Sequence, residues 1–174
     1  MRNGFFTKSR TGLLTRSAIV LCAIIGMATT AHAEQSANTG ETRLAPDEFD
    51  FAAAQKGGTG TSGVGGIRTL VLKGNPNGTG LYTILLSVPA HTKIAAHNHP
   101  DDRVATVISG VWRIGYGNTF DESRLKALPP GSFYTEPAGE MHFAETQDTP
   151  VVVQITGYGP SGTVYNKTSD TPGR

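Results

Sequence analysis

From Ile67 to about Gly159 the sequence is a succession of short segments rich in Val, Ile, Thr and aromatic residues, such as "IRTLVLK", "RVATVIS" and "VVVQITG". Stretches of Gly, Pro, Asn and Asp separate them, among them "GNPNGTG", "HPDD" and "PPG". β-branched and aromatic side chains favour strands, and the intervening residues favour turns. Many short strands at close spacing predict an all-β fold, an antiparallel sandwich or barrel. The one break, residues 120–128 ("FDESRLKAL"), predicts a turn or two of helix inserted in the sheet.

The N-terminus has the features of a secretory signal peptide. Residues 1–17 contain four basic side chains and no acid, and the apolar run Ala18–Ala28 and an Ala-x-Ala end at Ala33 follow. This pattern predicts cleavage after Ala33 and export to a bacterial periplasm or beyond. The apolar run is shorter than the roughly 20 residues that span a bilayer, so we expect no membrane anchor in the mature chain.

The mature chain has the length of one domain, because removing residues 1–33 from 174 leaves 141. The single cysteine, Cys22, lies in the predicted signal peptide, so neither a disulfide nor a thiolate ligand is expected in the mature chain. The formal net charge falls from +1 to −3 because no acidic residue lies in that peptide. Without a basic run, the composition gives no indication of nucleic-acid binding. Glycine-rich residues 34–66 predict a flexible arm, and residues 161–174 a loop-like tail.

Two histidines, His97 and His99, stand one residue apart in "AHNHPDD". On a strand, residues i and i+2 share a face roughly 6.5 Å apart, and two imidazoles there can reach one metal ion. Pro100 ends the strand because it cannot donate to the ladder, so the pair lies at a strand end. Taken alone, the pair is equally compatible with two surface histidines.

A longer pattern surrounds this pair and resembles the two motifs of the cupin superfamily, G-x5-H-x-H-x(3,4)-E-x6-G and G-x5-P-x-G-x2-H-x3-N. Seven positions match in order and in register: His97, His99, Gly110, Gly131, Pro137, Gly139 and His142. Three positions depart from the family pattern: His91 stands at the first Gly, Arg103 at the Glu, and Thr146 at the final Asn. The resemblance covers residues 67–160.

This resemblance implies a single-domain cupin-type jelly-roll β-barrel with both motifs lining one lumen. It implies that His97, His99 and His142 are ligands of one divalent ion, for which iron, manganese, zinc and nickel all remain open. It also implies a homodimer as the default assembly.

Arg103 is the departure that bears most on this site. A guanidinium has no lone pair to donate and repels a dication. Three interpretations remain open: three histidines plus water hold the ion, Asp101 or Asp102 replaces the missing carboxylate, or the metal site is lost and Arg103 binds an anionic ligand group. A purely structural role, in which Arg103 pairs with Asp101 or Asp102 at the barrel rim, is also open.

The leading hypothesis is an exported cupin that binds one divalent metal and acts, if it is an enzyme, on a small organic substrate. Oxygenase, isomerase and decarboxylase reactions are all compatible with the resemblance, and fold does not decide among them. Tyr134 and Glu136, just before the second motif, are weak candidates for a catalytic base, and Gln154 is a candidate ligand contact in the lumen. The alternative is a non-catalytic cupin that binds a small molecule or anion after loss of the metal site.

Overall fold

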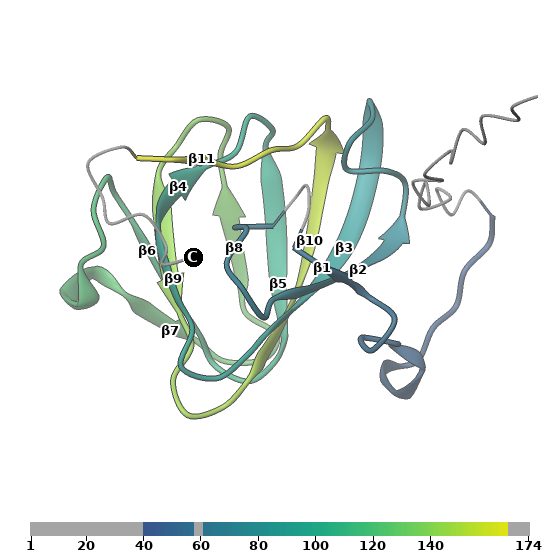
Figure 1. Cartoon of the computed structure of the whole chain (residues 1–174), viewed down its shortest axis with the longest axis horizontal. Helices are drawn as coiled ribbons and strands as arrows, with labels where there is room; N and C mark the ends of the chain where they lie inside the picture. The colour runs from purple at the N-terminus through teal and green to yellow at the C-terminus, as the bar shows by residue number, and fades with distance from the viewer. Residues whose placement is uncertain (1–39, 58–60, 167–174) are drawn as a thin grey trace, which may run out of the picture. The chain divides into compact units, whose positions relative to one another are not determined.

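The computed structural model describes residues 40–57 and 61–166, which form two antiparallel sheets packed against each other (Figure 1). The predicted signal peptide (residues 1–33) and the end of the tail (residues 167–174) lie outside the described residues. Within the described part, helical structure is limited to two short 3-10 turns, η1 (Pro46–Glu48) and η2 (Glu122–Arg124). The predicted all-β jelly-roll fold is therefore confirmed.

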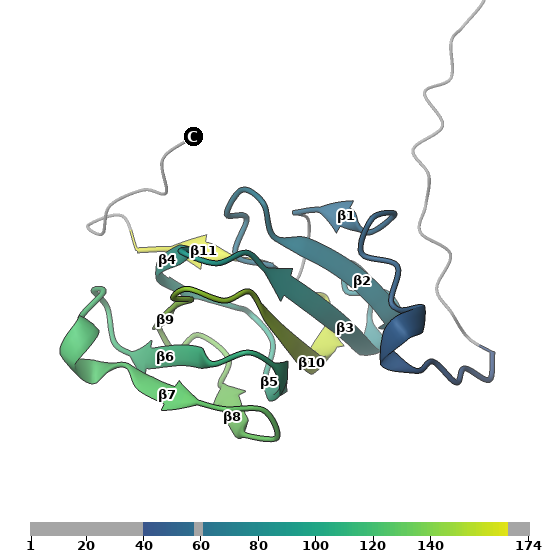
Figure 2. The same cartoon turned by 90° about the horizontal axis from the view of Figure 1, so that it is seen from below.

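The two sheets are built from strands that are far apart in sequence (Figure 2). The six-stranded sheet has the order β1 (Gln55–Lys56), β2 (Arg68–Lys73), β3 (Gly80–Val88), β10 (Val151–Gly159), β5 (Arg103–Ser109), β8 (Phe133–Glu136). The five-stranded sheet has the order β11 (Val164–Tyr165), β4 (Lys93–Asn98), β9 (His142–Glu145), β6 (Trp112–Tyr116), β7 (Lys126–Leu128).

Residues 120–128, predicted to hold a turn or two of helix, contain one short helical turn. This 3-10 turn, η2, begins after Asp121, whose side chain accepts a hydrogen bond from the backbone N–H of Ser123 at 3.0 Å. The residues that follow form β7, which pairs antiparallel with β6. The second part of the segment thus forms a strand that pairs with β6, and only its first part is helical.

The inward face of the six-stranded sheet changes character along β10. Val151, Val153 and Ile155 are fully buried in the apolar core between the sheets. Two residues further, Gly157 faces the same way and aligns with Tyr82 on β3 and with Arg103 on β5. The apolar layers therefore end at a polar row, which continues to Glu136 on β8, the Cα partner of Arg103.

Gly157 leaves the space that this polar row needs. A Cβ at this position would lie 2.6 Å from the hydroxyl of Tyr82 and 2.7 Å from Oδ2 of Asp101, closer than van der Waals contact allows. The glycine therefore lets two polar side chains from other parts of the chain approach the backbone of β10.

The first positions of the two motifs share an unusual backbone conformation. His91 has a φ of 54° and Gly131 a φ of 84°, both in the left-handed region that favours glycine. The backbone N–H of His91 donates to the carbonyl of Gln147 at 2.8 Å, which ties this turn to the segment after β9. At the first position of the first motif, where the family pattern has glycine, His91 therefore adopts a backbone conformation that favours glycine.

Segments on either side of residues 67–160 also pack on the sheets. Thr61 and Ser62 are buried, and their carbonyls accept hydrogen bonds from the hydroxyls of Thr163 and Tyr165. β11, which contains Tyr165, pairs with the edge of β4. The packed body therefore extends beyond the range covered by the motif resemblance. No helix among the described residues is long and apolar enough to cross a membrane.

Candidate metal centre

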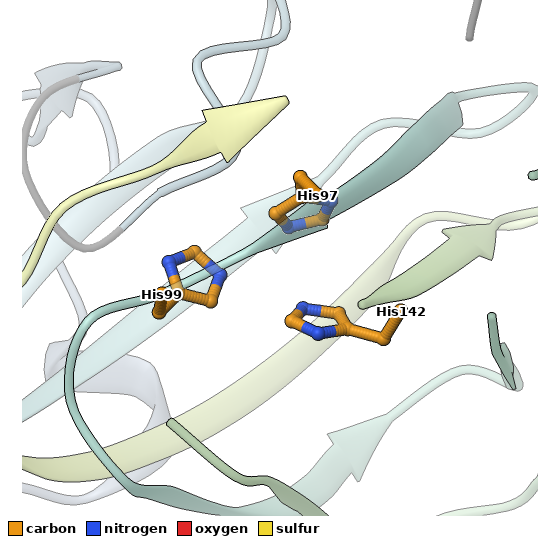
Figure 3. A group of neighbouring side chains, drawn as sticks. All are labelled: His97, His99 and His142. Atoms are coloured by element: carbon orange, nitrogen blue, oxygen red, sulfur yellow. The ribbon is translucent and has the colours of Figure 1, made fainter. Parts of the chain in front are cut away.

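The three motif histidines come together at one end of the five-stranded sheet (Figure 3). His97 on β4 and His142 on β9 are Cα partners, and His99 lies in the turn that follows β4. Their ring centroids are 4.4 Å apart for His97 and His142, 4.9 Å for His97 and His99, and 5.2 Å for His99 and His142. All three side chains are buried, and one potential ligand atom from each lies within 4.8 Å of the other two. The three histidines could therefore hold one metal ion.

Backbone carbonyls orient all three imidazoles. Nδ1 of His97 lies 2.8 Å from the carbonyl of Ala95, and Nδ1 of His142 lies 3.2 Å from that of Glu140. Nδ1 of His99 contacts the carbonyl of Gly162 in the segment before β11. A carbonyl oxygen only accepts hydrogen bonds, so we assign the proton of each ring to Nδ1 and the lone pair to Nε2. A ring nitrogen held in this way by a backbone carbonyl is typical of metal-binding histidines.

The Nε2 atoms of His99 and His142 support the same assignment. Both atoms are buried and have no hydrogen-bond partner among the described residues. Burying a polar nitrogen without a partner costs roughly 1–3 kcal/mol, so such an atom calls for an explanation. A metal ion bound by both atoms would remove this cost.

Burial also keeps the three rings neutral, the form that binds a metal. It lowers the pKa of His97 to about 3, an effect that the neighbouring His142 increases. The pKa of His99 is likewise about 3, lowered by burial and then by the charge of Arg103. Burial lowers the pKa of His142 as well. Protons therefore compete with a metal for these nitrogens much less than they do at an exposed histidine.

Arg103 does point into the barrel, where it pairs with Glu136. The exposed fractions of these residues are only 3% and 4%. Nε of Arg103 donates to Oε2 of Glu136 at 2.8 Å, and Nη2 of the same guanidinium donates to the same oxygen. A pair of Arg103 with Asp101 or Asp102 was one of the interpretations that the sequence left open. The strand pairing of β5 with β8 instead brings Glu136 to it.

The carboxylate of Glu136 also faces two of the histidines. Its Oε1 lies 3.7 Å from Nε2 of His142, and its Oε2 lies 3.8 Å from Nε2 of His99. Burial alone would raise the pKa of Glu136, but Arg103 and then the histidines outweigh it and lower the pKa to about 2. For Arg103, burial would lower the pKa, and the charge of Glu136 reverses this and raises it. The pair is therefore ionised, and the guanidinium charge beside the histidines is compensated.

The two aspartates of the first motif take other positions. Asp101 is buried, and its Oδ2 accepts a hydrogen bond from the hydroxyl of Tyr82 at 2.6 Å. Burial raises the pKa of Tyr82 to about 12, so this hydroxyl stays a donor. Asp102 is exposed, and its Oδ1 accepts a hydrogen bond from the backbone N–H of Ala138 at 2.8 Å. The described residues whose ligand atoms converge are the three histidines, without Asp101 or Asp102.

These features can now be compared with known proteins. No protein-family model matches the sequence, and no curated protein matches it. Among solved structures, the DMSP lyase DddQ from Ruegeria pomeroyi DSS-3 is similar at 18% identity over 72% of this chain, with a TM-score of 0.49. A sugar phosphate isomerase from a cupin superfamily, from Silicibacter pomeroyi DSS-3, is similar at 18% identity over 59% of this chain, with a TM-score of 0.47. The two packed antiparallel sheets are those of the jelly-roll β fold that the motif resemblance implies.

A salicylate 1,2-dioxygenase from Pseudaminobacter salicylatoxidans is also similar to this chain, at 15% identity over 58% of it, with a TM-score of 0.48. The similarity covers 60% of the DMSP lyase, 67% of the isomerase and 30% of the dioxygenase. The reactions in these names are those of the neighbouring proteins.

Two further candidate residues, Tyr134 and Gln154, lie on opposite faces of the six-stranded sheet. Tyr134 on β8 is buried and faces inward, two residues before Glu136 on the same face. Burial, followed by the charge of Glu136, raises its pKa well above 10. Gln154 lies between the inward-facing Val153 and Ile155 of β10, so its half-buried side chain is on the outer face of the sheet. The structure thus places Tyr134 near the polar row and Gln154 away from the lumen.

Two residues of the site, Tyr82 and Gly162, lie outside the sequence motifs, and only Tyr82 has a signal in the sequence that could have identified it. Tyr82 shares its face with Ile84 in "GLYTILLSV", which already places it on the buried side of β3. The contribution of Gly162 is a backbone carbonyl, which no side-chain pattern records.

Proposed function

We propose that this cupin binds one divalent metal ion through Nε2 of His97, His99 and His142 and is a metal-dependent enzyme for a small organic substrate. One observation supports this above the others: the three Nδ1 atoms are held by carbonyls while the potential ligand atoms converge within 4.8 Å. When bound, the ion would supply Lewis-acid chemistry at an oxygen of the substrate. Iron, manganese, zinc and nickel all suit imidazole ligands, and oxygenase, isomerase and decarboxylase reactions remain the candidates.

The residues around the histidines differ in what they can contribute. Glu136, with a pKa of about 2 beside Arg103, holds a proton poorly at neutral pH and is a weak general base. Tyr134, whose pKa lies well above 10, stays protonated. Within this site, Glu136 is therefore better suited to hold positive charge than to remove protons from a substrate.

The alternative, an anion-binding cupin that lost its metal, has less support. In that alternative, Arg103 binds an anionic group of the ligand. The guanidinium, however, is buried and already makes two hydrogen bonds to Glu136. A ligand would have to displace a buried carboxylate to reach it.

Metal content tests the proposed function. Mass spectrometry of the chain, purified without a histidine tag and incubated with iron, manganese, zinc and nickel, should find about one ion per molecule. His142→Ala should lose it, because it removes one of the three converging nitrogens. His91→Ala is the matched control and should retain it, because the side chain of His91 is 73% exposed and lies outside the cluster. Absence of metal from the parent, or equal metal in His142→Ala, would contradict the proposal.

We further propose a periplasmic or secreted location for the mature protein. The support is the predicted signal peptide of residues 1–33, with its Ala-x-Ala end at Ala33. No second cysteine is present to form a disulfide in an oxidising compartment, so stability there rests on the core.

We also propose that the outer face of the six-stranded sheet pairs with a second copy of the chain. Leu81, Val104, Phe133 and Tyr158 are large apolar residues on this face, between 44% and 65% exposed. The outward positions of β3, β5, β8 and β10 carry no charged side chain, so two copies can meet without like-charge repulsion.

Light scattering after gel filtration tests this dimer. The parent should have twice the mass of one mature chain, and Phe133→Lys with Tyr158→Lys should give a monomer. Val164→Lys, which alters an equally exposed side chain on β11 of the other sheet, should remain dimeric. A monomeric parent would refute the proposed interface.

A further inference from the structure

We propose that Glu136 supplies a fourth protein ligand to the ion, and that Arg103 holds its carboxylate in position. The inference rests on the proposed binding of metal by the three histidines and extends it to a residue outside the positions where the two motifs place ligands. It also answers the question that Arg103 raises, because it assigns the missing carboxylate to another strand.

The first argument comes from distances. Two ligands that share an ion at about 2.0–2.2 Å lie roughly 3–3.6 Å from each other. Glu136 lies 3.7 Å from Nε2 of His142 through Oε1 and 3.8 Å from Nε2 of His99 through Oε2. Both separations are too long for hydrogen bonds. The distance from Oε1 to His142 is close to that of two ligands around one ion, and the distance from Oε2 shows that the same carboxylate also faces His99. The group whose ligand atoms converge within 4.8 Å consists of the three histidines, so the carboxylate has to move towards them when the ion binds.

The second argument comes from strand pairing. Arg103 stands at the position where the family pattern has Glu, and its Cα partner across the β5–β8 ladder is Glu136. Directly opposite residues on one face of a sheet have Cβ atoms about 4.5–5.5 Å apart. In this chain a carboxylate therefore stands on β8, opposite the β5 position at which the family pattern has Glu. It lies 3.7 Å from His142 and 3.8 Å from His99.

The third argument comes from the way Arg103 holds the carboxylate. Nε and Nη2 both donate to Oε2, so the oxygen nearer to His142, Oε1, points away from this fork. This arrangement favours binding through one oxygen. It also fixes the carboxylate, because the planar guanidinium sets its orientation. Arg103 is therefore a positioning residue for Glu136 and not a ligand.

The charges agree with this arrangement. Arg103 adds one positive charge beside the site, but Glu136 and the buried Asp101 add two carboxylates to the same polar row. A divalent ion at the histidines would therefore face a surrounding with more negative than positive charge. The Arg103 guanidinium does not forbid the ion once both carboxylates are considered.

Titration with cobalt(II) tests the inference on the full chain. Glu136→Gln keeps the shape of the side chain but removes its charge, so we expect cobalt affinity to fall at least about tenfold, with a changed d–d absorption spectrum. The matched control is Glu145→Gln, which breaks another cross-strand pair, Arg113 with Glu145, in the five-stranded sheet. This control should leave affinity and spectrum unchanged.

Two more variants address folding and the role of Arg103. The double variant Arg103→Met with Glu136→Gln removes the pair as a whole, so no buried charge is left unpaired, and it should show the same altered cobalt spectrum as Glu136→Gln. Arg103→Met alone should weaken cobalt binding, and Arg103→Lys should restore part of it, because an ammonium still attracts the carboxylate but lacks the fork.

The outcomes separate this inference from the proposed function. Cobalt binding that is lost in His142→Ala but unchanged in affinity and spectrum in Glu136→Gln would overturn the role of Glu136 and leave the three-histidine site standing. A parent that binds no cobalt would overturn both.

Discussion

Replacing Glu136 by Ala in the metal-free protein should lower the free energy of unfolding by about 3–5 kcal/mol, because it leaves the buried guanidinium of Arg103 without this carboxylate. Chemical denaturation at neutral pH measures the effect. The magnitude reflects burial: the side chains of both partners are at most 5% exposed, so water cannot replace the lost charge. A loss below about 1 kcal/mol would show that the pair is not buried as described.

Two controls make this prediction specific. Replacing Glu145 by Ala breaks the more exposed pair with Arg113, joined at 3.1 Å, and should cost about 1 kcal/mol or less. Arg103→Met combined with Glu136→Gln should recover much of the loss of Glu136→Ala, because neither partner is then left as an unpaired charge. A double variant as unstable as the single one would assign the effect to lost packing.

The metal-free protein should also lose stability steeply in mild acid. His97 and His99 have a pKa of about 3 in the folded protein against 6.5 for the free side chain. Below pH 6.5 the unfolded chain therefore binds more protons than the folded one, and the free energy of unfolding falls as the pH falls towards 3. Each histidine approaches a slope of about 1.4 kcal/mol per pH unit only below its unfolded pKa, so His97 and His99 together give a loss of about 3 kcal/mol between pH 6.5 and 5. Glu136, with a folded pKa of about 2, adds a further loss below pH 4.5.

Urea denaturation at a series of pH values measures this slope. His99→Gln should make the slope clearly shallower, because one of the three histidines with a lowered pKa is gone. A bound metal should make the slope steeper, because protons then compete with the ion as well, while raising stability at neutral pH. Stability of the metal-free parent that stays constant between pH 7 and 5 would contradict the burial of neutral imidazoles.

The fold could be predicted from the sequence because its signals are local. Alternating β-branched residues and Gly or Pro turns identify the strands, and the spacing of His97, His99 and His142 identifies the candidate ligands. The candidate metal site required only that the two motifs lie on neighbouring strands, and β4 and β9 do pair at His97 and His142.

What the sequence missed depends on contacts between distant residues. Arg103 and Glu136 are 33 residues apart, and only the β5–β8 pairing makes them neighbours. Gly162 orients His99 from 63 residues away through its backbone. In "VVVQIT" alternation assigns Gln154 to one of two faces, but the sequence does not say which face is buried. Here the core takes Val153 and Ile155, so Gln154 lies outside.

The most direct test of the central claim is anomalous diffraction from a crystal of the protein loaded with the metal that it retains. One peak should lie about 2.0–2.2 Å from Nε2 of His97, His99 and His142, with Oε1 of Glu136 the nearest protein oxygen. No peak between the three rings, or a peak at the exposed pair of His91 and Asp148 instead, would contradict the account.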